Sequence, residues 1–219
     1  MASTALGAAR TFLRTPRGKA TRIILGSSSK VRRTLMDELC SEVGDGLLQY
    51  QVRTADIDEK AIRREKPEDL VTTLALAKAE AIKKKLEAED NGNTLLITCD
   101  QVVVHEGRIL EKPESEEEVR ENVKGYAKSY PSTVGAIAVT ELSTGKVELE
   151  IDVANIHFES IPEESVETLI KEGEVFWAAG GLLVEHPLVQ PHVVKIEGTM
   201  DGVMGLPKAR VLNLLSKFF

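Results

Sequence analysis

Residues 95–104 read Leu-Leu-Ile-Thr-Cys-Asp-Gln-Val-Val-Val, a short apolar run that Asp100 interrupts. A run of this length and composition is typical of a strand buried on both faces of a sheet. A carboxylate inside such a strand costs several kcal/mol unless it is paired or bound to a metal. We therefore predict a chemical role for Asp100; a carboxylate that caps N–H groups at a bulge or strand end is the alternative.

The segments on either side of this run alternate between strand and helix signals. Before it, the sequence predicts strands at 22–25 and 47–54, a helix from the cap Ser29 to 43, a charged loop at 56–67 and a helix at 68–88. After it, the sequence predicts a short strand at 108–110, a helix opened by 115–118, a hairpin of 133–141 with 146–158, a helix from 162 to about 173, a strand at 192–196 and a terminal helix opened by Pro207. Hairpins among crossover helices indicate an α/β fold with a mixed sheet.

Composition limits the possible partners. The chain has 219 residues, enough for one domain or two small lobes that share a core. A net charge of -7 argues against binding to nucleic acid, although one local basic pocket could still take a phosphate. No apolar run approaches the length of a membrane span. The two cysteines, Cys40 and Cys99, are too few for a disulfide framework or a zinc site, which favours a reducing compartment.

The first 20 residues differ from the remainder, because they carry basic residues and the first acid is Asp37. Arginine-rich, acid-poor leaders direct proteins to organelles. We favour the other interpretation, a flexible basic extension over 1–20 before a domain at 21–219, and a cytoplasmic location.

The stretch Leu25-Gly-Ser-Ser-Ser-Lys-Val-Arg-Arg33 leads from a predicted strand into a helix. Helix N-termini attract anions, the hydroxyls of Ser27 and Ser29 would add donors, and Arg32 could grip a phosphate with its planar fork. An ordinary serine cap followed by exposed arginines is the alternative. The spacing is not that of a Walker P-loop.

Further charged residues stand at unusual positions. Lys78 shares a predicted helix face with Val71, Leu74 and Ile82, so its ammonium either reaches the surface or meets an anion in a cleft. The acidic loop Asp56-Ile-Asp-Glu59 could supply ligands for Mg²⁺, or it could be a solvated loop. Lys112 is held by the following proline, a weak signal alone. The four histidines show no metal-ligand spacing.

In this order, the segments resemble the Maf-like family of nucleotide pyrophosphatases. The loop at 25–33 is similar to the family's SxSxxR, and 55–59 to its short acidic motif. The remaining matches are Leu76-Ala-Lys-Ala-Glu80 to LAxxKA, Thr98-Cys-Asp-Gln-Val-Val103 to ADTxV, Gly107-Arg-Ile-Leu-Glu-Lys-Pro113 to GxxLxKP, and Gly205-Leu-Pro207 to VGLP. Several motifs in the right order are specific, whereas each alone is weak.

The resemblance implies an inosine-triphosphatase-like fold: an elongated mixed sheet flanked by helices, two lobes with a central cleft, and usually a homodimer. It implies hydrolysis of nucleoside triphosphates to the monophosphate and pyrophosphate, with Mg²⁺ or Mn²⁺, in the removal of non-standard nucleotides. Asp100 matches the family's proton acceptor and, with Glu59, a metal-binding position. The positions that match phosphate-binding residues are Ser27, Ser29, Arg32, Lys78 and Lys112.

Three positions depart from the family pattern where the family reads the base: Val31, Gln101 and Glu185. The segment from Tyr126 to Ser132 also lacks the usual LSGxxH. An ionised glutamate is a pure acceptor. We therefore expect a base edge rich in donors, such as cytosine, guanine or a methylated purine, instead of the common dTTP/UTP preference.

Two other functions are compatible with parts of the sequence. A nucleotide-binding regulator without catalysis would account for the altered base-reading positions, although the retained cationic positions and Asp100 argue against it. A haloacid-dehalogenase-type phosphatase is suggested by Asp56-Ile-Asp58, but the Glu59-Lys60 that follows does not fit that motif.

Overall fold

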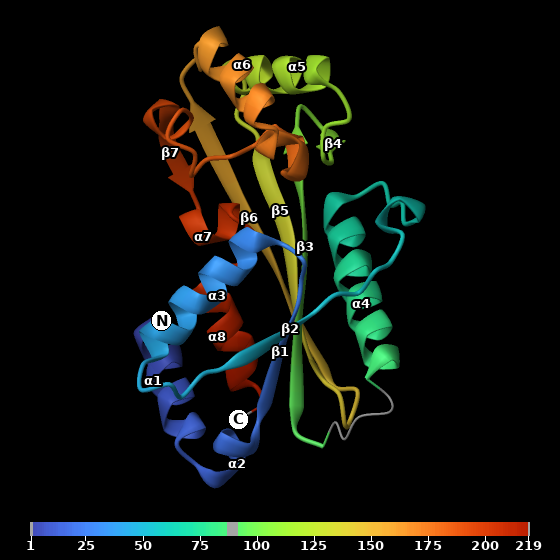
Figure 1. Cartoon of the computed structure of the whole chain (residues 1–219), viewed down its shortest axis with the longest axis vertical. Helices are drawn as coiled ribbons and strands as arrows, with labels where there is room; N and C mark the ends of the chain where they lie inside the picture. The colour runs from blue at the N-terminus through green and yellow to red at the C-terminus, as the bar shows by residue number, and fades with distance from the viewer. Residues whose placement is uncertain (1, 87–91, 219) are drawn as a thin grey trace. The chain divides into compact units, whose positions relative to one another are not determined.

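The computed structural model describes residues 2–86 and 92–218. A seven-stranded sheet has the order β2-β1-β3-β5-β6-β7, with β4 paired to β3 off this path (Figure 1). β1 is parallel to β2 and β3, whereas β3/β4 and β6/β7 are antiparallel, so the predicted mixed sheet is confirmed. The strands are β1 (Arg22–Gly26), β2 (Tyr50–Arg53), β3 (Thr94–His105), β4 (Arg108–Leu110), β5 (Ser132–Glu141), β6 (Val147–Phe158) and β7 (Val193–Glu197).

Helices flank this sheet, as the sequence predicts for an α/β fold. The α-helices are α1 (Ala2–Leu13), α2 (Pro16–Ala20), α3 (Lys30–Val43), α4 (Pro67–Lys85), α5 (Glu116–Tyr126), α6 (Glu163–Glu172), α7 (Met200–Val203) and α8 (Lys208–Ser216). Short 3₁₀ turns are η1 (Glu59–Ala61), η2 (Glu174–Trp177), η3 (Ala179–Gly181) and η4 (Gln190–His192). Figure 1 shows α4 on one side of β1 and β3, and α3 and α8 on the other.

Local signals explain where most elements begin. The Ser29 side chain accepts a hydrogen bond from the Arg32 N–H, and Ser115 accepts one from the Glu118 N–H, so both predicted caps are confirmed. β2 begins later than predicted, at Tyr50. Its pairing with β1 starts there, because Tyr50 lies opposite Ile23 near the beginning of β1. The predicted end of the helix at 88 lies outside the described residues.

The chain divides into two compact units. The first comprises the chain up to Asp100, Ala136–Ile151 and the chain from Gly205 onward; the second comprises Gln101–Gly135 and Asp152–Met204. Each unit has its own apolar cluster. Ile24, Ile82 and Leu96 belong to the cluster of the first, and Val119, Tyr126 and Ile156 to that of the second.

The N-terminal segment forms α1 and α2 where the sequence predicts an extension. Arg10 donates from Nε to the Val43 carbonyl at 2.8 Å and from Nη2 to the Glu42 carbonyl at 2.6 Å. These are carbonyls of the last turn of α3, which lack helical partners. The flexibility and any processing of this segment stay predictions. None of the helices in the described ranges is long and apolar enough to cross a membrane.

Candidate active site

Asp100 of β3 and Lys78 of α4 form a buried ion pair in the first unit. Lys78 Nζ lies 2.5 Å from Asp100 Oδ1, and the two residues are 8% and 7% exposed. Neither charge could be buried at this depth without a partner except at large cost in free energy. Lys78 thus supplies the positive charge that a carboxylate buried within β3 requires.

A second contact fixes the relative placement of α4 and β3. Thr98 is fully buried, and its hydroxyl donates to the Ala75 carbonyl at 2.9 Å. Thr98 precedes Asp100 by two residues and shares its face of the strand, while Ala75 precedes Lys78 by about one helical turn. The Thr98 bond therefore sets which turn of α4 lies opposite Asp100. Sequence reasoning missed Thr98, although a hydroxyl residue two positions from Asp100 in an apolar run is a usable signal.

Glu59 joins this pair from the 3₁₀ turn η1. Its Oε1 lies 2.9 Å from Lys78 Nζ, so two carboxylates converge on one ammonium group. Among residues 2–86 and 92–218, no group of three or more histidine, cysteine or acidic side chains could hold a metal. Two carboxylates nevertheless suit an ion such as Mg²⁺, which takes one or two of them and fills its remaining positions with water and substrate phosphates.

Burial controls the protonation of Asp100. Removal from water raises the pKa of its carboxyl above the usual aspartate value, and the charge of Glu59 acts in the same direction. Lys78 and Arg32 oppose this shift with their positive charges. A carboxylate of raised pKa is a stronger proton acceptor than an ordinary aspartate.

The serine loop is ordered by its own hydrogen bonds. The Ser29 N–H donates to Ser27 Oγ at 3.2 Å, and Ser29 Oγ accepts from the Arg32 N–H at 3.3 Å. Arg32 donates from Nε to the Gly205 carbonyl at 3.0 Å and from Nη1 to the Cys99 carbonyl at 3.1 Å. The guanidinium thus ties the first turn of α3 to the peptide that leads into Asp100. Val31 lies beside it in the same turn of α3.

The other candidate residues belong to the second unit. Gln101 donates from Nε2 to the Gly202 carbonyl at 2.8 Å. Lys112 is exposed and follows β4. Much of Glu185 is exposed as well, yet partial desolvation raises the pKa of its carboxyl above the usual glutamate value. The structure therefore brings Asp100, Lys78, Glu59 and Arg32 together within the first unit, whereas Gln101, Lys112 and Glu185 belong to the second.

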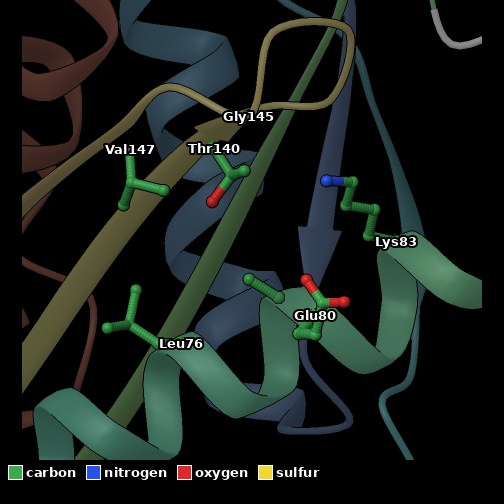
Figure 2. A pocket seen from close by; sticks show the side chains of 7 residues that line it. Leu76, Glu80, Lys83, Thr140, Gly145 and Val147 are labelled. Carbon is green, nitrogen blue, oxygen red and sulfur yellow. The ribbon is translucent and has the colours of Figure 1, made fainter.

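A pocket of about 250 Å³ opens on another side of α4 (Figure 2). Leu76, Glu80 and Lys83 point into it from the helix, and Thr140 and Val147 from the ends of β5 and β6. Its lining includes none of the predicted site residues. The chemistry predicted for Asp100 therefore does not involve this pocket.

The family model described as Maf-like protein matches residues 22–218 of this sequence. The chain belongs to the Maf-like protein family. The match begins at the first residue of β1, so α1 and α2 precede the part that Maf-like proteins share. Every candidate residue named above lies inside the matched range.

This Maf-like chain is similar to curated nucleotide pyrophosphatases. It is 36% identical to a 7-methyl-GTP pyrophosphatase of Dictyostelium discoideum, over 89% of this chain and 96% of the relative. It is 30% identical to a 7-methyl-GTP pyrophosphatase of Idiomarina loihiensis, over 88% of this chain and 92% of the relative. It is also 30% identical to a dTTP/UTP pyrophosphatase of Pelotomaculum thermopropionicum, over 90% of this chain and 96% of the relative.

Proposed function

We propose that this chain cleaves nucleoside triphosphates between the α- and β-phosphates and acts on a 7-methylguanine nucleotide. The chain is a nucleotide pyrophosphatase, a hydrolase of acid anhydrides, as its Maf-like relatives are. Removal of non-standard nucleotides is the role that such a substrate indicates. The buried Asp100–Lys78 pair, with Glu59 against the same ammonium, is the observation that carries the proposal.

Hydrolysis needs a proton acceptor and a cationic environment for the phosphates. A water oxygen attacks the α-phosphorus, the bond from that atom to the bridging oxygen breaks, and pyrophosphate leaves with the electron pair. The proton lost by the water passes to the Asp100 carboxylate, whose raised pKa suits this role. Lys78 stabilises the negative charge that develops on the phosphate oxygens.

The loop residues would bind the phosphate chain. The hydroxyls of Ser27 and Ser29 and the N-terminal end of α3 offer hydrogen-bond donors to an anion. Arg32 would contribute positive charge while its Nε and Nη1 hold the Gly205 and Cys99 carbonyls. Lys112 keeps the phosphate-binding role that the family resemblance implies.

A divalent ion fits the carboxylates of the first unit. Asp100 and Glu59 would hold Mg²⁺ or Mn²⁺ through carboxylate oxygens, the ligands that such hard cations prefer. When bound, the ion supplies Lewis-acid neutralisation of the phosphate charge. A homodimer and a cytoplasmic location stay predictions from the family resemblance and the composition.

The choice of base rests on Glu185. A 7-methylated guanine ring carries positive charge and presents adjacent N–H donors, which an ionised carboxylate complements better than an amide does. Val31 and Gln101 are the other proposed base-selecting positions. The names of the relatives from Dictyostelium discoideum and Idiomarina loihiensis support this substrate.

Product analysis tests the proposal directly. The wild-type chain, Asp100→Asn and the exposed-site control Asp69→Asn are incubated with 7-methyl-GTP, GTP, CTP, dTTP and UTP, each with Mg²⁺ or Mn²⁺. We expect monophosphate and pyrophosphate, fastest from 7-methyl-GTP, and a loss of about 10²- to 10⁴-fold in Asp100→Asn alone. Orthophosphate would indicate a phosphatase, and tight binding without turnover would indicate a regulator.

A further inference from the structure

One buried glycine of the second unit, Gly180, is hydrogen-bonded through both its N–H and its carbonyl. The Gly180 N–H donates to the Glu111 carbonyl at 2.7 Å, and the Gly180 carbonyl accepts from the Tyr126 hydroxyl at 2.7 Å. Gly180 has a φ of 62°. A Cβ there would lie 2.4 Å from the Tyr126 hydroxyl oxygen, so only glycine allows this approach.

The Tyr126 ring is fixed by its neighbours. Tyr126 is 2% exposed, lies edge-on to His105 at a centroid distance of 5.2 Å and stacks on Phe158 at 6.0 Å. His105 is itself held, because its Nε2 lies 2.8 Å from Ser129 Oγ. Burial raises the pKa of the Tyr126 hydroxyl, so it remains a hydrogen-bond donor across neutral pH.

The hydrogen bonds of Gly180 join segments that are far apart in sequence. Glu111 immediately precedes Lys112, and Gly180 lies in η3, five residues before Glu185 and four before the buried Val184. The Gly180–Glu111 hydrogen bond therefore links the segment of the proposed phosphate contact to the segment of the proposed base contact. The Tyr126 hydroxyl holds the carbonyl of the same glycine.

We propose that Tyr126 is a positioning residue for base selection, because its hydroxyl holds Gly180 and thereby fixes the Glu185 segment against that of Lys112. The inference rests on the proposed roles of those two residues. It gives a function to the segment that starts at Tyr126, in which the sequence departs from the family's LSGxxH pattern. Tyr126 touches neither the base nor the phosphates in this proposal.

Removal of one oxygen atom tests it. Tyr126→Phe keeps the ring but leaves the buried Gly180 carbonyl without its hydroxyl donor. We expect the ratio of kcat/KM for 7-methyl-GTP to that for dTTP to fall about tenfold, the scale of one lost hydrogen bond to a specificity segment. The change should appear in KM for 7-methyl-GTP, with kcat nearly unchanged, since the chemistry belongs to Asp100.

Tyr130→Phe is the matched control, because Tyr130 is 51% exposed and the same oxygen is removed from the same unit. Its selectivity ratio should equal that of the wild type. A parallel loss of activity on both nucleotides in Tyr126→Phe would indicate a merely structural hydroxyl and overturn the inference. An unchanged ratio in folded Tyr126→Phe would overturn it too.

A second variant decides the matter if Tyr126→Phe does not fold. Phe158→Leu loosens the stacked ring and keeps the hydroxyl, so a smaller shift in the same direction is expected, and an unchanged ratio contradicts the inference. If the wild type releases no pyrophosphate, the proposed function is wrong. The inference is then tested by calorimetry, in which Tyr126→Phe should raise the ratio of the Kd for 7-methyl-GTP to the Kd for dTTP.

Discussion

At the scale of single residues, removal of the Lys78 ammonium and removal of one of its two carboxylate partners should have different effects on stability. Lys78 forms ion pairs with both Glu59 and Asp100, whereas the ion-pair partner of Asp100 in the described residues is Lys78. Removing one carboxylate leaves the buried ammonium with the other. Removing the ammonium leaves the buried Asp100 carboxylate without its ion-pair partner and next to Glu59, whose side chain is 44% exposed.

Substitution at the two ends of this pair should therefore differ in cost. We expect Lys78→Met to lower the free energy of unfolding by about 3–5 kcal/mol, and Asp100→Asn to lower it by clearly less, because Glu59 still compensates Lys78. Denaturant unfolding at neutral pH measures both values. Equal losses would show that Glu59 contributes nothing to the neutralisation of Lys78.

The Glu185 carboxyl gives a pH dependence whose sign is set by its raised pKa. The ionised form is the proposed partner of the 7-methylguanine edge, and this form is lost as pH falls through the raised pKa. KM for 7-methyl-GTP should thus increase on acidification at a higher pH than an ordinary glutamate would require.

The comparison uses Glu185→Gln, which cannot titrate. In this variant KM for 7-methyl-GTP should be high throughout and lack that pH step, while KM for dTTP should follow the same pH profile as in the wild type. A wild-type step that persists in Glu185→Gln would assign the titration to another group.

At the scale of elements, the first unit depends on the close approach of α4 to β1 and β3. Gly26 pairs with Thr98 in the parallel register of these strands. A Cβ on Gly26 would lie 2.6 Å from Ile82 Cδ1 and 2.7 Å from Thr98 Cγ2. The close packing of α4 against Gly26 also allows the hydrogen bond from Thr98 to Ala75. That bond in turn places Lys78 near Asp100.

Overpacking at this contact should be measurable and partly reversible. We expect Gly26→Ala to lower the free energy of unfolding by about 1–3 kcal/mol, because α4 must shift. Addition of Ile82→Val removes the Cδ1 atom in the way, so the double variant should be more stable than the two single losses add up to. Gly7→Ala, with nothing within 4 Å of its new Cβ, is the control. Additive losses would contradict the proposed clash.

Local sequence signals were enough to predict most helices and strands. Where a predicted boundary was wrong, the reason is physical. Ser29, Ser115 and Pro207 mark helix starts that depend on neighbouring residues only. β2 starts at Tyr50 because its partner residues in β1 start there, and an apolar pattern does not report which residues a neighbouring strand can pair.

In the candidate site too, some features follow from local sequence signals and others from tertiary packing. Asp100 and Lys78 could be predicted because each breaks the pattern of its own element. The contacts of Glu59 with Lys78 and of Thr98 with Ala75 could not, because they join residues from different elements and depend on tertiary packing. The relatives supply the family, whereas the clamp at Gly180 came from coordinates alone.

At the scale of the whole molecule, the compact units are not consecutive in sequence. The boundary falls inside β3, between Asp100 and Gln101, and again inside β5 and β6. A fragment that ends at Asp100 lacks the β5 and β6 segments of the first unit and the whole of α8. Such a fragment loses packing partners for a large apolar surface.

We expect the fragment 1–100 to show no cooperative thermal transition by circular dichroism, in contrast to the full chain. Its exposed apolar residues should bind a hydrophobic dye, as in partly packed compact states. A sharp transition in the fragment would mean that the strands and helices up to Asp100 hold their own core without the later segments.

The interleaved order also has a consequence for synthesis on the ribosome. The segments of the second unit are all present once Met204 has emerged, whereas the first unit requires the residues from Gly205 onward, made after every other segment. The first unit therefore cannot be completed before the second unit has been synthesised, so the two units cannot fold one after the other from the N-terminus. The nascent α4 and β3, with Lys78 and Asp100, are therefore made long before the β5, β6 and α8 segments that complete their unit.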